Sequence, residues 1–208
     1  MKSSTKHCAE FIMDYLLAGE VPMITSSPGV GKSDIIRSVA KQNNLLVIDL
    51  RLSQCDPTDL NGFPSLNMDK TRSGYVPMDT FPIEGDILPE GYKGWMLLLD
   101  ELNSASQAVM AAAYKLILDR QVGMFKLHKN VAIVAAGNLS TDKAIVNRTS
   151  TAMQSRLCHI ELEVDNEAWI EWAHTHGIDY RITSFIEFKP DLLHNFDPNH
   201  NDNTFPCP

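Results

Sequence analysis

The sequence predicts an α/β fold of three layers, in which a five-stranded parallel sheet lies between two layers of helices. Three observations support this prediction. Short apolar runs, typical of strands buried on both faces, alternate along the chain with segments of helical periodicity. The helical segments lie between successive strands, which is the pattern of a parallel sheet with crossover connections. A turn with two glycines follows the first apolar run and opens a helix, as in phosphate-binding domains.

The expected elements follow one another in a regular order. Apolar residues three and four positions apart predict a helix over residues 5–18, and Gly19 suits its C-terminal cap. Ser104 and Gln107 form a capping-box pattern before a helix with an apolar face. Residues 121–127, with Gly123 in the middle, predict a small hairpin. Four buried, apolar strands are expected at residues 21–25, 45–50, 95–99 and 131–136, and a fifth, with alternating character, at 157–164. Further helices are expected at 34–43, 152–156, 166–176 and 179–188.

One long segment interrupts this order. Residues 56–94 carry five prolines and five glycines and show little periodicity. We interpret them as short helical or extended pieces within an exposed insertion, because a structureless loop of this length is uncommon unless it is functional. Residues 1–164 are expected to form the α/β domain, and residues 165–208 a second, helical part without a regular signal after residue 193.

The composition excludes several classes of protein. No apolar run reaches the roughly 18 residues of a membrane span, and the basic N-terminus lacks the apolar block of a signal peptide. The four cysteines lie far apart without a Cys-x-x-Cys pair, which is typical of thiols in a reducing compartment. We therefore expect a cytoplasmic protein. The net charge of −8 argues against broad nucleic-acid binding, which needs a concentrated basic surface.

The glycine-bearing turn, Ser26 to Ser33, is close to the phosphate-binding P-loop. Gly29 and Gly31 allow the backbone N–H groups to turn toward a polyphosphate. Lys32 supplies a cation for the β- and γ-phosphates, and Ser33 a hydroxyl for Mg²⁺. Ser26 stands where the first glycine of the pattern usually lies, and an ordinary strand-to-helix turn is the alternative. The expected nucleotide contacts are Ser27, Pro28, Gly29, Val30, Gly31, Lys32, Ser33 and Asp34.

A second signal lies at the end of the strand expected over residues 95–99. Asp100 and Glu101 follow this strand directly, so in a parallel sheet they lie at the same edge as the P-loop. Asp100 could then hold Mg²⁺ together with Ser33, and Glu101 could deprotonate a water that attacks the γ-phosphate of ATP. The alternative is a solvated acidic pair at the start of a helix.

Two further positions suit the same chemistry. Asn138 follows the strand over residues 131–136 and could position the attacking water, although a turn-forming Gly-Asn pair is an equal alternative. An arginine, Arg148 or Arg156, could reach the γ-phosphate on a neighbouring molecule and stabilise developing charge. From the residues alone, both arginines remain open, as does a surface role for either one.

With these motifs in this order, the chain resembles the AAA+ ATPases, and specifically their MoxR-like branch within the helix-2-insert clade. The resemblance covers nearly the whole chain. Its motifs are Pro57-x-Asp59-Leu60-x-Gly62-Phe63-Pro64, Asp100-Glu101-Leu102-Asn103, Leu118-Asp119-Arg120-Gln121-Val122-Gly123, Ala136-Gly137-Asn138, Ser155-Arg156-Leu157 and Trp169-x-x-Trp172-Ala173.

The resemblance implies a Mg²⁺-dependent ATPase that forms a ring, usually a hexamer, and remodels a protein partner, often a von Willebrand A-domain protein. Asn138 would be sensor 1, and Arg156 would be the arginine finger that acts on the neighbouring subunit. Residues 56–94 would include the helix-2 insert, and residues 121–127 the pre-sensor hairpin. Both would line the working surface of the ring.

The chain departs from the family at Ser26 and at its end. Relatives continue after the segment Phe205-Pro206-x-Pro208 into an arginine-bearing helix that supplies sensor 2. Residues 165–208 would therefore be the incomplete beginning of a helical lid. A nucleotide-gated assembly module with little turnover is one alternative function. A DNA-directed AAA+ motor is another, although the negative charge disfavours it.

Overall fold

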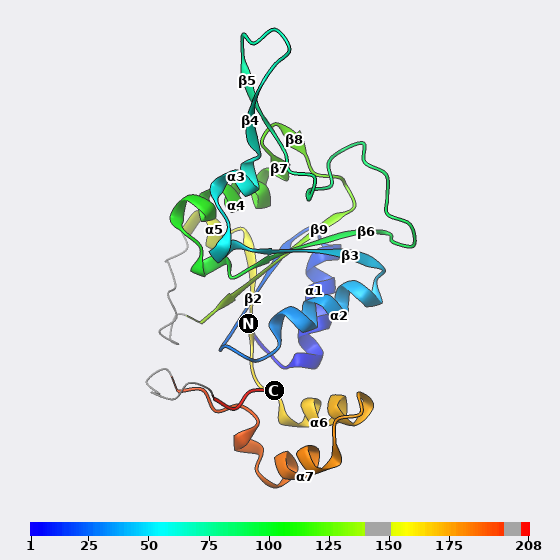
Figure 1. Ribbon diagram of the computed structural model, residues 1–208. Helices are drawn as coiled ribbons and strands as arrows, with labels where there is room; N and C mark the ends of the chain where they lie inside the picture. Colours follow the sequence, from blue (N-terminus) through cyan, green and yellow to red (C-terminus); the bar gives the residue numbers. More distant parts are fainter. Residues whose placement is uncertain (140–150, 198–204) are drawn as a thin grey trace.

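A six-stranded parallel sheet forms the centre of the protein. The computed structural model describes residues 1–139, 151–197 and 205–208 (Figure 1). Neighbouring strands pair in the order β1-β10-β2-β9-β6-β3, and every pairing is parallel. Their bounds are β1 Lys2–Ser3, β2 Val21–Ser26, β3 Leu45–Arg51, β6 Gly94–Asp100, β9 Val131–Asn138 and β10 Leu157–Leu162.

The expected count of five strands is wrong by one. The additional strand, β1, has only two residues and pairs with Glu161 and Leu162 of β10. A strand this short has no periodicity of its own, so only its pairing reveals it. The expectation of a buried strand over residues 45–50 is also wrong in part. β3 lies at an edge of the sheet, and its residues are half-buried or exposed.

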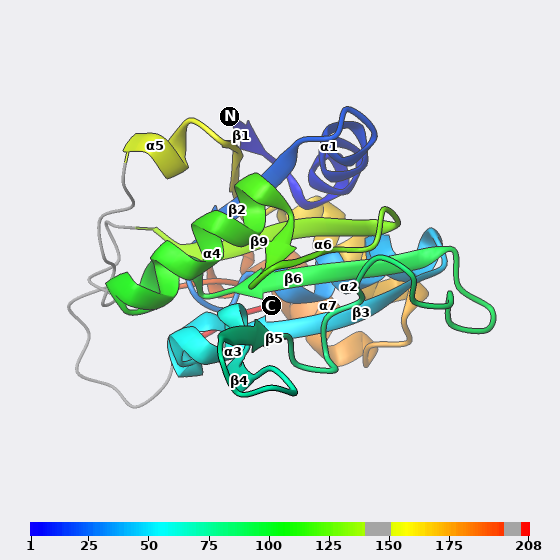
Figure 2. The same ribbon diagram turned by 90° about the horizontal axis from the view of Figure 1, so that it is seen from above.

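Helices cover both faces of the sheet. α1 (Thr5–Leu17) and α2 (Lys32–Gln42) lie below the sheet in Figure 1, whereas α3 (Pro57–Asn61) and α4 (Gln107–Asp119) lie above it. In Figure 2, which views the molecule from above, α4 lies in front of the sheet. α5 (Thr151–Gln154) contributes Met153 to the core on the α4 side. The expected three-layer arrangement is therefore present.

Alternation along the strands builds the two cores. All seven residues of β6 are buried. Trp95, Leu97 and Leu99 belong to the core beneath α4, while Met96 and Leu98 belong to the core shared with α1 and α2. Successive side chains of a strand point to opposite faces, so a strand between two helical layers must be apolar throughout. This requirement explains why the apolar runs predicted the inner strands well.

The segment between β3 and β6 contains short elements and a protruding hairpin. After η1 (Leu52–Gln54) and α3, strands β4 (Phe63–Leu66) and β5 (Ser73–Val76) pair antiparallel. The hairpin expected over residues 121–127 is formed by β7 (Gln121–Val122) and β8 (Phe125–Lys126). The two hairpins touch: a Cβ on Gly123 would lie 3.0 Å from Tyr75 Cβ.

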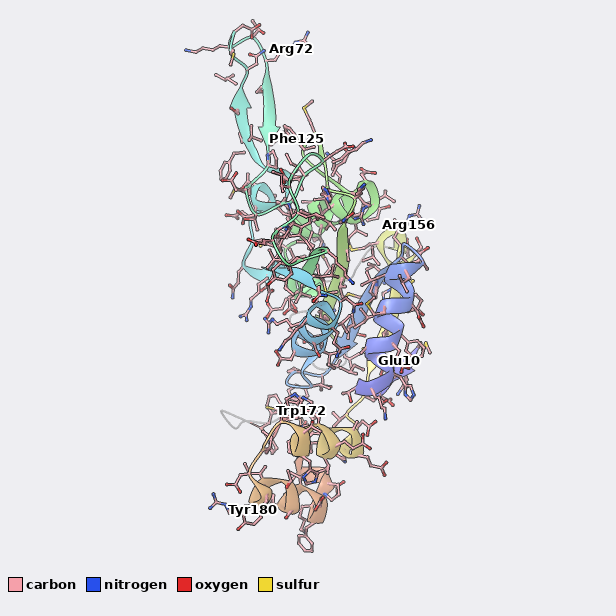
Figure 3. The ribbon with its side chains drawn as sticks, turned by 90° about the vertical axis from the view of Figure 1, so that its right-hand side faces the viewer. Glu10, Arg72, Phe125, Arg156, Trp172 and Tyr180 are labelled. Carbon is pink, nitrogen blue, oxygen red and sulfur yellow. The ribbon has the colours of Figure 1, made fainter. Side chains whose placement is uncertain are left out.

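The two hairpins carry a group of exposed apolar side chains. Figure 3 shows Arg72 near the far end of the longer hairpin and Phe125 closer to the body of the protein. The exposed apolar residues of this region, which we call the hairpin surface, are Phe63, Leu66, Met68, Tyr75, Val76, Met124 and Phe125.

The C-terminal part consists of two helices below the α1–α2 layer (Figure 1). α6 (Asn166–Thr175) and α7 (Tyr180–Phe188) agree with the expected helices to within one residue at each end, and η4 (Pro190–Leu192) follows. Gly177, at a φ of 71°, takes the left-handed conformation that separates them. The proposed division into two domains at residue 164 stays a prediction.

The start of α4 differs from the expectation. Ser104 belongs to the short helix η2 (Leu102–Ser104), and the N-cap of α4 is Ser106, whose hydroxyl accepts a hydrogen bond from Val109 N at 3.3 Å. The capping box predicted at Ser104 is therefore wrong, because η2 takes up the residues before Ala105. In the described ranges, we find no helix with the length and apolar character that a membrane span requires.

Candidate active site

The predicted phosphate-binding loop lies between the end of β2 and the start of α2. Gly29 and Gly31 have φ values of 79° and 84°, in the left-handed region that favours glycine. Gly31 is also the N-cap of α2, so the first turn of this helix directs its free N–H groups toward the loop. Both glycines therefore have the left-handed backbone that the sequence predicted, while phosphate binding by this loop stays a prediction.

Lys32 connects the loop to a neighbouring strand. Its Nζ lies 3.2 Å from the carbonyl oxygen of Ser26, 3.3 Å from that of Ser27 and 3.2 Å from Asn138 Oδ1. Asn138 ends β9, which pairs with β2 through Ser26. The half-buried ammonium is therefore held by these three oxygens at the carboxyl end of the sheet.

Ser26 occupies the position where the P-loop pattern has its first glycine. The residue is fully buried, and its hydroxyl donates to Ser27 O at 2.8 Å and accepts from Lys32 Nζ at 3.0 Å. Both partners belong to the loop itself. The serine is thus accommodated without an unpaired polar atom.

Ser33 and Asp100 meet across the site. Ser33 Oγ, in the first turn of α2, donates to Asp100 Oδ2 at 2.8 Å, and Asp100 itself is nearly buried at the end of β6. A hydroxyl and a carboxylate oxygen at contact distance are hard ligands of the kind that Mg²⁺ prefers. The two residues therefore fit the metal that the sequence predicted, beside the loop that would hold the phosphates.

Glu101 has an unusual backbone conformation. Its φ of 55° places a non-glycine residue in the left-handed region, and its N–H donates to Asp100 Oδ1 at 2.8 Å. Its carboxylate accepts a hydrogen bond from the hydroxyl of Ser53, in η1. This conformation turns the chain sharply after β6. Ser53 was not among the predicted site residues, because nothing in its local sequence distinguishes it.

Asn138 is held by a second asparagine that the prediction left without a role. The side chain of Asn103 donates from Nδ2 to Asn138 O at 2.7 Å and accepts from Asn138 N at 3.1 Å through Oδ1. Asn103 is almost fully buried. Gly137 has no room for a side chain, since a Cβ there would lie 2.4 Å from Asn103 Oδ1. The only sequence signal for this residue is its position in the motif Asp100-Glu101-Leu102-Asn103.

Two of the predicted nucleotide contacts have structural partners of their own. Asp34 is exposed and accepts a hydrogen bond from Arg37 at 3.0 Å, and Arg37 also donates to Asp49 at 2.6 Å. These contacts raise the pKa of the Arg37 guanidinium, Asp49 having the largest effect. Val30 is buried in the core beside α1 and α2. A contact of either residue with nucleotide stays a prediction.

Arg156 lies at the amino ends of the parallel strands, whereas the P-loop lies at their carboxyl ends. It follows α5 and is exposed (Figure 3), and the next residue, Leu157, pairs with Val21 at the start of β2. The loop begins at the other end of β2, about 16 Å away at about 3.3 Å per residue. Arg156 is therefore not brought to the P-loop of its own chain. The alternative candidate, Arg148, lies outside the described residues.

The C-terminal tail contacts the P-loop, which the sequence did not indicate. His194 Nε2 lies 2.9 Å from Pro28 O, and a Cβ on Gly29 would lie 2.6 Å from Cys207 Cβ. The ring of Phe205 packs edge-on against His194 with centroids 6.2 Å apart. These contacts join the loop to residues 166 or more positions away, in a tail without periodicity, so no local pattern could predict them.

Comparison with solved structures supports the fold. No protein family model matches the chain. A "putative ATPase" from Cytophaga hutchinsonii matches with a TM-score of 0.58 at 18% identity, over 84% of this chain and 51% of that protein. NtrX from Brucella abortus in complex with ADP matches with a TM-score of 0.51 at 17% identity, over 84% and 41% of the two chains. NtrX in complex with ATP gives a TM-score of 0.51 at 16% identity, with the same coverage.

Together with the parallel sheet and its two helical layers, these similarities confirm the predicted class of fold, a three-layer α/β domain. The chain spans about half the length of the Cytophaga protein and about two fifths of NtrX. At 16–18% identity, this similarity establishes the fold alone.

Proposed function

We propose that this protein is an ATPase whose active site consists of the P-loop and the ends of β6 and β9. The proposal depends mainly on two contacts: Lys32 Nζ lies 3.2 Å from Asn138 Oδ1, and Ser33 Oγ donates to Asp100 Oδ2 at 2.8 Å. Three segments far apart in the sequence therefore meet at one sheet edge, where ligands of parallel α/β sheets bind. Simple nucleotide binding would need the loop alone.

The chemical roles follow from charge and position. The loop N–H groups and Lys32 would hold the β- and γ-phosphates of ATP. Ser33 and Asp100 would hold Mg²⁺, which supplies positive charge beside the phosphates. Glu101 takes a proton from the attacking water, and Asn138 orients this water or contacts the γ-phosphate.

We further propose a MoxR-like AAA+ ATPase that acts as a ring and remodels a protein partner, such as a von Willebrand A-domain protein. The ordered motifs and the AAA+ type of fold support this assignment. The exposed apolar side chains of the hairpin surface suit contact with another protein. The position of Arg156, far from its own P-loop, suits a role at the site of a neighbouring subunit.

The substitution Glu101→Gln tests the chemistry. We expect ATP binding close to that of the unmodified protein and hydrolysis at least about 100-fold slower, because an amide cannot accept the proton of the attacking water. Phosphate release and calorimetric titration with ATP measure the two quantities. Lys32→Ala is the control, in which binding itself should be lost. Hydrolysis by Glu101→Gln at the original rate would refute the assignment of the general base.

A nucleotide-gated assembly module with little turnover is the second candidate, and Ser26 favours it. The buried hydroxyl at 3.0 Å from Lys32 Nζ competes for a cation that would otherwise serve the phosphates. Single-turnover hydrolysis with the protein in excess over ATP distinguishes the candidates. An ATPase releases phosphate on the time scale of its steady-state turnover, whereas a gated module retains intact ATP.

A further inference from the structure

The amide of Asn103 completes the parallel sheet at the active-site edge. Backbone pairing between β6 and β9 ends at Leu99 and Ala135. β6 ends at Asp100, and the chain turns away from β9 at Glu101, whose φ is 55°. Asn138, further along β9, would then lack a strand neighbour on the β6 side.

The side chain of Asn103 takes the place of that neighbour. A carboxamide has the same donor and acceptor as a peptide group. Asn103 uses both of them, donating to Asn138 O at 2.7 Å and accepting from Asn138 N at 3.1 Å. On its other side, β9 stays paired with β2, where Leu139 N donates to Ser26 O at 3.3 Å. The end of β9 is therefore fixed from both sides.

The same short turn carries the proposed general base. Glu101 precedes η2 by one residue, and Ser104 N donates to Glu101 O at 2.9 Å, so Glu101 and Asn103 belong to one hydrogen-bonded turn. Because Asn103 is almost fully buried and Gly137 leaves it no free space, the amide has little room to move. The positions of Glu101 and Asn138 are thus linked through a single side chain.

We propose that Asn103 is a positioning residue, which holds Asn138 at a fixed place relative to Glu101 and thereby aligns the attacking water. The proposal rests on the ATPase function proposed above. Asn103 touches neither Lys32 nor the glycines of the loop in the contacts described. Asn103 holds the backbone of Asn138 and reaches Lys32 only through the Asn138 side chain, whose Oδ1 lies 3.2 Å from Lys32 Nζ. Its loss should therefore lower turnover more than nucleotide affinity. Small displacements of positioned groups lower reaction rates by large factors.

The substitution Asn103→Leu removes both hydrogen bonds while keeping a similar size. We expect kcat to fall at least about tenfold, with KM and the dissociation constant of ATP within about threefold of the original values. Asn130→Leu is the matched control. The side chain of Asn130 donates to Lys93 O at 2.9 Å, at the opposite end of β9, so we expect its loss to affect the sheet and leave kcat unchanged.

The substitution Asn103→Asp adds a readout that a purely structural role would not change. An ionised aspartate accepts from Asn138 N but repels Asn138 O, whereas a protonated one can donate to that oxygen again. Burial and the facing carbonyl favour the protonated form. We therefore expect kcat, relative to the original protein at the same pH, to rise as the pH falls from about 8 to about 6.

Hydrogen exchange at the amide of Asn138, followed by NMR, gives a measurement independent of turnover. We expect at least about tenfold faster exchange in Asn103→Leu than in the original protein or in Asn130→Leu. An unchanged kcat in Asn103→Leu, or unchanged exchange at Asn138, overturns the positioning role. If the original protein releases no phosphate at all, the ATPase proposal fails, and the exchange result still decides whether Asn103 holds Asn138.

Discussion

A single hydroxyl distinguishes this P-loop from the usual pattern. Ser26 is buried, and its Oγ bonds both Ser27 O and Lys32 Nζ within the loop. A glycine there would leave Lys32 with one fewer oxygen to contact. The ammonium would then exchange fewer protein contacts for phosphate contacts when a nucleotide binds.

The substitution Ser26→Gly should therefore bind ATP more tightly, by about threefold to tenfold. The same change should lower the free energy of unfolding by about 1 kcal/mol, because glycine adds backbone freedom to the unfolded chain. Calorimetric titration and thermal unfolding measure the two effects. Ser26→Ala separates them, since it removes the hydroxyl and retains the Cβ. Unchanged affinity in both variants would show that the hydroxyl does not restrain Lys32.

Among the secondary-structure elements, α4 is separated by two residues from the short helix η2, which follows the proposed catalytic residue Glu101. Ser106 caps the helix, with its hydroxyl accepting from Val109 N at 3.3 Å, while Ser104 closes η2. The short helix therefore carries Asn103, and the long helix begins only after Ala105.

The substitution Ser106→Ala should lower the free energy of unfolding by about 1 kcal/mol, because a free N–H at the helix start loses its acceptor. Ser104→Ala is the control, for which we expect a change within about 0.5 kcal/mol. Urea denaturation monitored by circular dichroism compares the two. A larger decrease in the free energy of unfolding for Ser104→Ala than for Ser106→Ala would show that Ser104 caps the helix, as the sequence suggested.

Elements that depend on local patterns could be predicted, and those that depend on distant partners could not. The inner strands were found because burial on two faces requires an apolar run, as at Met96, Leu97 and Leu98. β1 was missed because its two residues become a strand only by pairing with β10. In the site, the P-loop, Asp100 and Glu101 form short motifs. The contact of Asn103 with Asn138 joins residues 35 positions apart, and no local pattern encodes it.

For the whole molecule, the two edges of the sheet carry different parts of the proposed mechanism. The P-loop lies at the carboxyl edge, whereas Arg156 lies near the start of β10 at the opposite edge. A cation at that distance cannot stabilise charge on a phosphate bound to its own chain. Its proposed role as an arginine finger therefore requires a second subunit.

Mixing two inactive variants tests this arrangement. By the proposed roles, Lys32→Ala would lose ATP binding but retain the finger, while Arg156→Ala would hold ATP without a finger. We expect each alone to hydrolyse ATP at less than about 5% of the original rate, since an arginine finger contributes a factor of about 10³ or more. Their mixture should recover measurable phosphate release.

The double variant Lys32→Ala/Arg156→Ala is the control for this mixture and should restore nothing when added to Arg156→Ala, because neither partner then has the finger. Light scattering with a slowly hydrolysed ATP analogue measures assembly under the same conditions. Full activity in Arg156→Ala would remove the arginine from the mechanism.

The left-handed backbone conformation of Glu101 lowers the stability of the folded protein at a position proposed to serve catalysis. A side chain at a φ of 55° costs about 1 kcal/mol relative to glycine, and asparagine tolerates this region better than glutamate. Selection for thermal stability alone would thus replace Glu101 with residues that cannot act as a base. With Glu101 as the proposed general base, gains in stability at residue 101 and gains in turnover would lie in opposite directions.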